Sequence, residues 1–273
     1  MAIVTIAREL AAMGDETAHK LKEILNYRLI EKKDLEDRMK SFGAEEQKIF
    51  KYDERKPSFF AALSQDRDDY LCCLKSAVFS EAGGGNCIFI GRGSAVLFRG
   101  IPGVLSVFLA APLEVRLERV KSYFHCDERR ARQIIDQSDR HREGFHHYFF
   151  EIKWKGPENY HLALNTGFLH PELCAEMIKA VVEKTITPED EAANALRIKE
   201  LILGQQVVHH VRFEKAVPIH FFEAVVKSGT VTLFGVVNSP SLVETAVQAA
   251  REVPGVQSVV SEIQIVQEYS VVP

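Results

Sequence analysis

The first residues of the chain constrain its fold more than any other segment. An apolar strand is predicted at Ile3–Ile6, a loop is centred on Gly14, and apolar residues at helical spacing follow at Ala18, Leu21 and Ile24. A strand that runs through a glycine loop into a helix is the arrangement with which P-loop phosphate sites begin. The segment therefore predicts an α/β domain whose ligand would lie at the Gly14 loop.

The loop departs from a working P-loop (Walker A) sequence. Such a loop needs glycines whose N–H groups wrap phosphate, a lysine for the β/γ oxygens and a hydroxyl for Mg²⁺. Registered on Gly14, the chain carries acids at three of these positions: Glu9 at the first glycine, Asp15 at the lysine and Glu16 at the Ser/Thr. A like charge about 4 Å from a phosphate oxygen costs on the order of 4 kcal/mol at an effective dielectric of 20. We therefore expect weak binding of a nucleoside triphosphate.

Two other interpretations of this loop stay open. Asp15 and Glu16 are also the residue type that stabilises the positive N-terminus of a helix, without any ligand. Alternatively, Arg8 supplies the missing cation, and Thr17, one residue past the hydroxyl position, supplies the missing hydroxyl.

The remainder of the chain shows two patterns of predicted secondary structure. Through residue 184, apolar strands at 87–90, 104–112 and 160–166 alternate with helices, one or two of them within 57–82, which predicts a mainly parallel sheet with flanking helices. Residues 185–193 combine a proline, acids and small residues and are predicted to be a linker. Residues 194–267 follow the order α-β-β-α-β, with a turn at Ser228-Gly229, and residues 268–273 form a tail.

Composition excludes several classes of protein. The net charge of −4 and pI near 6.2 provide no basic field for nucleic acid. No apolar run approaches the roughly 20 residues of a membrane span, and MAIVTIAREL lacks the pattern of an export signal, so we expect a cytoplasmic protein. The five cysteines form no C-x-x-C pair, and His141, His146 and His147 lack metal-ligand spacing, so no metal site is predicted.

Residues 1–184 resemble the cytidylate kinase-like family of P-loop proteins. The resemblance rests on the order and spacing of five segments: Ile6-Ala7-Arg8-Glu9, Ile88-Phe89-Ile90-Gly91-Arg92-Gly93, Phe108 to Arg116, Asp139-Arg140-His141-Arg142 and Leu164-Asn165-Thr166. It implies a nucleotide-kinase fold with ATP and Mg²⁺ as ligands.

The resemblance also implies roles for three arginines. Arg92 would hold the acceptor nucleotide, and Arg140 and Arg142 would belong to a lid that closes over the transferred phosphoryl group. From the residues alone, Arg92 is equally an arginine ion-paired at a strand end, and a basic helical face is most often solvated. Arg116 and Arg119, near Glu118, are interpreted as structural ion pairs.

Residues 194–267 are similar to a BON domain. The similarity rests on two glycine-marked segments, 229–235 and 253–259. It implies binding of phospholipid or a small ligand, but because no export signal is present we expect no lipid contact. On the strand with Phe221 and Phe222, one ring should face the core and the other should face outward.

Two functions follow from these features. The degenerate loop favours a pseudo-kinase that binds a nucleotide or small anion and acts as a regulatory or sensor module through its BON-like domain. The alternative is an active nucleoside monophosphate kinase of the CMP type, which transfers the γ-phosphoryl group of ATP. The residues leave the oligomeric state open, a homodimer included.

Overall fold

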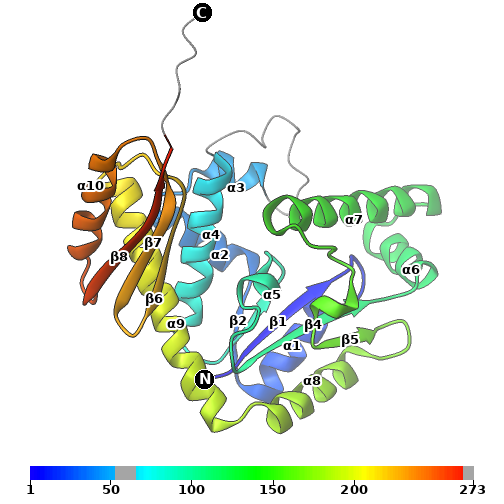
Figure 1. The fold of residues 1–273 in the computed structure, drawn as a ribbon. Helices are drawn as coiled ribbons and strands as arrows, with labels where there is room; N and C mark the ends of the chain where they lie inside the picture. Colours follow the sequence, from blue (N-terminus) through cyan, green and yellow to red (C-terminus); the bar gives the residue numbers. More distant parts are fainter. Residues whose placement is uncertain (53–65, 267–273) are drawn as a thin grey trace, which may run out of the picture. The chain divides into compact units, whose positions relative to one another are not determined.

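The computed structural model describes residues 1–52 and 66–266 (Figure 1). The chain divides into two units between Ala195 and Leu196. The start of the helix predicted within 57–82, with Phe60 and Leu63, and the tail at 268–273 lie outside the described residues.

The first unit is built on a parallel sheet with the order β2-β3-β1-β4-β5. Its strands are β1 Ile3–Arg8, β2 Arg28–Ile30, β3 Cys87–Ile90, β4 Val104–Ala110 and β5 Leu162–Asn165. Every pairing in this sheet is parallel. The central strand β1 is buried along almost its whole length, as expected of a strand covered on both faces. The predicted parallel α/β architecture is confirmed.

Helices cover both faces of this sheet. They are α1 Gly14–Leu25, α2 Lys32–Ser41, α3 Glu46–Lys51, α4 Asp66–Ala82, α5 Ser94–Leu97, α6 Leu113–Phe124, α7 Glu128–Phe150 and α8 Pro171–Thr185, with a short 3-10 turn η2 at Pro157–Asn159. On one face α1 and α8 pack together, with Leu21 and Ile178 in one apolar core with Ile6 and Val107 (Figure 1).

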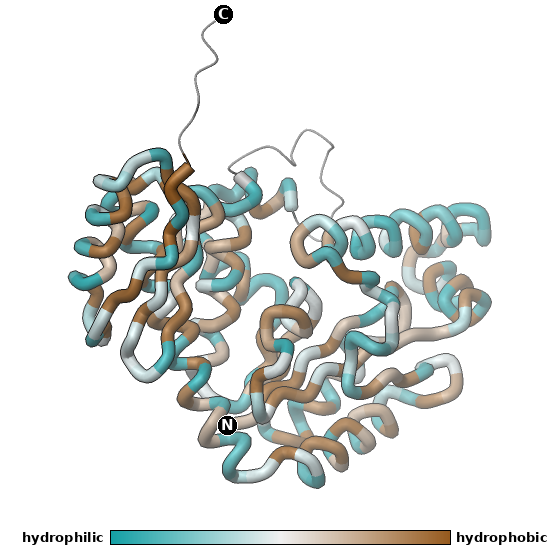
Figure 2. Tube along the Cα trace, viewed as in Figure 1, coloured by the Kyte–Doolittle hydropathy of each residue, from teal (hydrophilic) through white to brown (hydrophobic). Residues whose placement is uncertain are grey.

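The opposite face is closed by aromatic side chains. The ring of Phe98, just after α5, lies 5.8 Å from Phe79 of α4 and 5.2 Å from Phe89 of β3. In Figure 2 the central strands are largely hydrophobic, whereas much of α7 is hydrophilic.

Helices α6 and α7 form an antiparallel pair where the lid was predicted. Leu117 and Val120 of α6 pack on Ala131 and Ile135 of α7. The Asp127 side chain accepts a hydrogen bond from Arg130 N at 2.7 Å and caps α7.

The second unit contains a three-stranded sheet with the order β6-β7-β8. Its elements are the end of α9 Pro188–His209, the π-turn η3 His210–Glu214, β6 His220–Lys227, β7 Thr230–Val237, α10 Pro240–Arg251 and β8 Ser258–Ile265. β6 and β7 form an antiparallel hairpin, and β8 pairs parallel to β7, so the predicted α-β-β-α-β order is confirmed. Phe222 is buried and Phe221 is exposed, as predicted for neighbours on a strand.

The predicted linker is mostly helix. Residues 188–193 form the start of α9, which runs past the division between the units. Thr187 and Asp190 exchange hydrogen bonds across its first turn, at 3.0 and 3.1 Å. The proline and acids of the predicted linker also favour the first turn of a helix, so most of this segment is helical, and the division between the units follows shortly after it.

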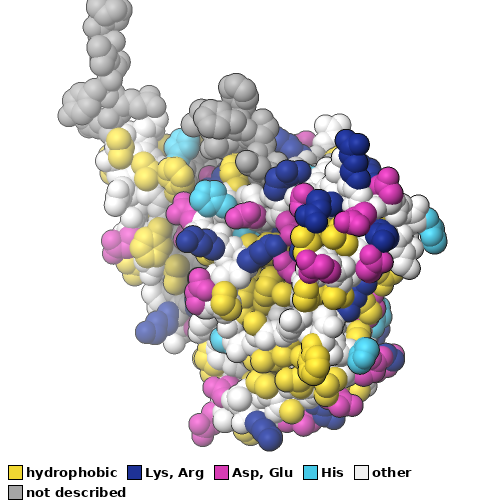
Figure 3. Space-filling model, turned by 90° about the vertical axis from the view of Figure 1, so that its right-hand side faces the viewer, with side chains coloured by type: hydrophobic (Ala, Val, Ile, Leu, Met, Phe, Trp, Pro, Cys, Tyr) yellow, Lys and Arg dark blue, Asp and Glu magenta, His cyan; other side chains and the backbone are white. Residues whose placement is uncertain are grey.

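No helix within residues 1–52 and 66–266 combines the length and the apolarity that a membrane crossing requires. Basic and acidic side chains are interspersed on the face of the molecule seen in Figure 3.

Candidate functional site

The loop between β1 and α1 keeps a tight shape without glycine at its turning points. Ala11 and Met13 have left-handed φ values of 60° and 55°. This conformation costs an L-residue about 1–2 kcal/mol. Gly14 is needed for space, because a Cβ at this position would lie 2.4 Å from the Cγ atom of Arg8.

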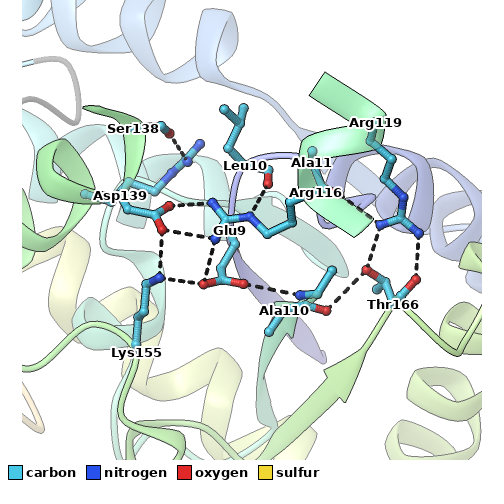
Figure 4. A network of polar contacts seen from close by, with 12 residues as sticks. Glu9, Leu10, Ala11, Ala110, Arg116, Arg119, Ser138, Asp139, Lys155 and Thr166 are labelled. Carbon is cyan, nitrogen blue, oxygen red and sulfur yellow. Dashed lines mark hydrogen bonds and ion pairs between the residues drawn. The ribbon is translucent and has the colours of Figure 1, made fainter. Parts of the chain in front are cut away.

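The negative charge of Glu9 is paired with cationic side chains of the protein. Its side chain is buried, with Oε1 3.1 Å from Arg116 and 2.6 Å from Lys155. Its Oε2 accepts a hydrogen bond from the backbone N–H of Ala111 at 3.2 Å. The expected repulsion of phosphate by Glu9 is therefore offset by two cations (Figure 4).

Asp139 of α7 completes a balanced set of charges. Its carboxylate accepts two hydrogen bonds from the Arg116 guanidinium, at 3.0 and 2.7 Å, and one from Lys155 at 2.8 Å. We call Glu9, Arg116, Asp139 and Lys155 the loop–lid network. It joins the end of β1, α6, α7 and the segment after α7 (Figure 4).

The network shifts the protonation of its members. Burial opposes ionisation of Asp139, but the hydrogen bonds from Arg116 and Lys155 outweigh burial and hold the pKa of Asp139 below its ordinary value. Burial also opposes the charge of Lys155, but the hydrogen bonds to Asp139 and Glu9 raise the pKa of Lys155 above its ordinary value. Both shifts favour the charged forms.

These shifts predict how stability depends on pH. Because folding lowers the pKa of Asp139, its stabilisation is complete above the unfolded value of about 3.9 and is lost as the pH falls through the lower folded pKa. The difference in Tm between the wild type and Asp139→Asn should be constant from about pH 7 to 5 and should narrow below about pH 4. Thermal unfolding at a series of pH values measures it. A difference that stays constant down to about pH 3 would contradict the assigned shift.

Arginines of α6 fix the carbonyl groups of the loop. Arg116 Nε donates to Leu10 O at 2.8 Å, and Arg119 donates to Ala11 O at 2.9 Å and to Thr166 O at 2.7 Å. The ion pairing predicted for Arg116 is confirmed, with Glu9 and Asp139 as its partners, whereas Arg119 binds carbonyl groups. Their partners lie on other segments of the chain, whereas the neighbouring Glu118 pairs with Lys121 at 2.9 Å.

The three residues at the start of α1 have protein partners. Asp15 lies 3.6 Å from Arg8, and Glu16 accepts a hydrogen bond from the Tyr123 hydroxyl at 2.6 Å. Thr17 is buried, and its hydroxyl donates to Met13 O at 2.7 Å.

A cavity of about 390 Å³ opens beside this loop. Its basic lining residues are Arg8, Lys32, Arg92, His141 and Arg142. The apolar ones are Leu10, Ile90, Phe124 and Ile134, and the neutral polar ones are Gln137 and Ser138. The basic groups come from β1, α2, the turn after β3, and α7. Such a lining suits an anionic ligand that also has an apolar part.

Arg92 is held in the cavity wall by an unusual turn. Its φ of 55° lies between Gly91 at 68° and Gly93 at 70°, and its side chain is almost wholly buried. The guanidinium lies 2.7 Å from Glu36 and donates to the Tyr70 hydroxyl at 3.4 Å. The ion pair at a strand end is therefore present, and Arg92 also lines the cavity, while its role toward an acceptor nucleotide stays a prediction.

The structure brings together only part of the predicted site. Arg8, Arg92 and Arg142 line the cavity, whereas Gly14, Thr17 and Arg140 do not. Arg142 donates to Ser138 Oγ at 2.6 Å, while Arg140 is exposed.

Several residues of the site were not predicted. They are Lys32, Glu36, His141 and Lys155. The Asp139–Arg142 segment contained a signal for His141, but the others lie in charged stretches that carry no distinguishing pattern. Among residues 1–52 and 66–266, no group of three or more His, Cys, Asp or Glu has metal-binding geometry.

The model of the cytidylate kinase-like family matches residues 3–167, more than half of the chain. The chain belongs to the cytidylate kinase-like family. A BON domain model matches residues 200–267 of this cytidylate kinase-like protein. The predicted fusion of the two is confirmed.

Individual relatives match over shorter segments. A cytidylate kinase of Sulfolobus acidocaldarius is 38% identical over 81 residues, which are 29% of this chain and 44% of that protein. A uronate isomerase of Corynebacterium glutamicum is 30% identical over 91 residues, 33% of this chain and 18% of that protein. The chain thus spans less than half the length of these two curated relatives.

A solved structure supports the fold. An uncharacterized protein from Eubacterium ventriosum has a TM-score of 0.53 at 19% identity, covering 67% of this chain and 99% of that one. At this identity the likeness concerns the fold alone.

Proposed function

We propose that the kinase-like domain binds a nucleotide or another small anion in the cation-lined cavity but does not transfer a phosphoryl group. The protein would then be a pseudo-kinase, which acts as a regulatory or sensor module together with its BON domain. The observation that carries this proposal is the balanced loop–lid network, in which the charge of Lys155 is matched by Glu9 and Asp139 at 2.6 and 2.8 Å.

The contrast between the loop and the cavity supports this division of roles. In the loop, no lysine stands at the P-loop position, and Asp15 remains largely exposed there. The cavity instead presents Arg8, Arg92 and Arg142 to a ligand. Guanidinium groups form forked, charge-assisted hydrogen bonds with phosphate oxygens, so this lining favours a monophosphate over a neutral ligand.

The second candidate is an active CMP-type kinase. Lys155 favours it, because its ammonium group lies 2.6 Å from Glu9 and would bring a cation to the loop. The identity to a cytidylate kinase over 81 residues adds to this candidate. ATP and Mg²⁺ would then be the donor and cofactor.

Titration calorimetry of the full chain with CMP tests the binding proposal. Arg142→Met should weaken CMP binding by about tenfold, because a charge-assisted hydrogen bond contributes about 1.5 kcal/mol or more. Arg140→Met is the matched control, since Arg140 lies on the same helix and is exposed. It should change the affinity less than twofold. Absence of CMP binding, or equal losses in the two variants, would contradict the proposal.

A further inference from the structure

Asp139 occupies a particular place on α7 relative to the cavity. Its neighbours Ser138, His141 and Arg142 line the cavity, whereas Asp139 does not. All four side chains belong to one rigid helix, with about 100° of rotation per residue. Any rotation or shift of α7 that frees Asp139 would therefore move the three cavity residues with it.

Asp139 is fixed to the loop through a single guanidinium. Arg116 holds the Asp139 carboxylate with two hydrogen bonds and holds Leu10 O with a third, at 2.8 Å. Leu10 lines the cavity. Arg116 therefore connects two walls of the cavity without lining it.

Lys155 fastens the same helix from the other side. Its ammonium group bridges Asp139 and Glu9, and the neighbouring Trp154 is buried with its ring 6.0 Å from His146 of α7 and 5.7 Å from Phe108 of β4. The far end of α7 is thus seated against the sheet by the segment that carries Lys155.

We propose that Asp139, Arg116 and Lys155 are positioning residues that seat α7 against the phosphate loop and so pre-form the anion cavity. This inference rests on the proposed function, because the proposed function is what assigns an anionic ligand to that cavity. A seated helix presents Arg142 and His141 without further ordering, and binding is stronger when such ordering is not required. An unseated α7 would have to be ordered by the ligand.

Trp154 provides a readout that needs no ligand. It is the single tryptophan of the chain, and its burial depends on the packing of α7. Its fluorescence emission therefore reports the seating of the helix. Hydrogen exchange of peptides covering residues 137–150 reports it independently.

The test compares Asp139→Asn with Asp139→Glu and with Asp136→Asn in the full chain. Asp136 is an exposed acid on the same helix, which makes it the matched control. Asp139→Asn should weaken CMP binding about tenfold, shift Trp154 emission to longer wavelength well below the unfolding temperature, and speed exchange in 137–150. Asp139→Glu, which keeps the carboxylate, should recover part of each change, and Asp136→Asn should match the wild type.

The outcomes separate the two proposals. If Asp139→Asn lowers Tm but keeps wild-type CMP affinity, emission and exchange, the network is only structural and the inference is overturned. If the wild type does not bind CMP, the proposed ligand fails. Trp154 emission and hydrogen exchange still test the seating of α7 in that case. Wild-type emission and exchange in Asp139→Asn would overturn the positioning role, and altered emission and exchange would support it.

Discussion

Replacing Arg116 by methionine is expected to lower the free energy of unfolding of the first unit by about 3–5 kcal/mol. Methionine keeps most of the aliphatic stem but removes the charge that separates Glu9 from Asp139, and it also removes the hydrogen bond to Leu10 O. The two carboxylates would then share Lys155 alone, whose side chain is about half exposed. Loss of one partner from a buried ionic cluster is among the most destabilising single changes.

Thermal unfolding followed by circular dichroism measures this effect, with an expected fall in Tm on the order of 10 °C. Arg129→Met is the control, because Arg129 is an exposed arginine of α7 and should change Tm by only a degree or two. A Tm of Arg116→Met close to that of Arg129→Met would show that the network contributes little to stability.

Arg92→Met is expected to weaken CMP binding on the order of 100-fold, because it removes a buried guanidinium with two donor-bearing arms from the cavity wall. Its cost to stability should be smaller than that of Arg116→Met. Glu36, the carboxylate left behind, keeps Lys32 at 3.6 Å and is partly exposed. The larger loss of CMP affinity is therefore expected for Arg92→Met, and the larger loss of stability for Arg116→Met.

Calorimetry of two further variants makes this prediction specific. Arg92→Lys keeps the charge but loses the fork, so its affinity should fall about tenfold. Arg99→Met removes an exposed arginine shortly after the same turn, bonded to Asn159 at 2.8 Å, and should leave the affinity unchanged. Equal affinities for Arg92→Met and Arg99→Met would remove Arg92 from the ligand site.

The central strands of the first unit were predictable because they are buried on both faces. β1, β3 and β4 therefore read as continuous apolar runs, and α1 between β1 and β3 shows helical periodicity. A continuous apolar run in the sequence therefore indicates a strand that is buried on both faces. The same acids and proline that favour a helix N-terminus also favour a linker, however, so the pattern at 185–193 did not reveal that most of this segment is helical.

The charge network was not predictable from local pattern. Lys155 pairs with Glu9 across 146 residues of sequence, and nothing near either residue marks the other. The sequence placed three acids at the loop, but their electrostatic effect depends on partners that only the fold supplies. Glu9 is neutralised inside the domain, so the case for altered chemistry rests on the pairing of Lys155 with Glu9 and Asp139, on the absent loop lysine and on Asp15.

The two arginines assigned to the lid show the same limit. Arg140 and Arg142 are two residues apart, so on a helix they point about 200° away from each other. The family resemblance grouped them, whereas only Arg142 reaches the cavity. Helical geometry predicts this separation, but it does not tell which of the two faces inward.

The most direct test of the pseudo-kinase proposal is phosphoryl transfer by the full chain. Purified protein is incubated with CMP, ATP and Mg²⁺, and formation of CDP is followed by phosphorus NMR beside a protein-free sample. We predict that CMP binds while CDP forms no faster than in the protein-free sample. CDP formation that scales with protein concentration and saturates with CMP would contradict it and establish the kinase.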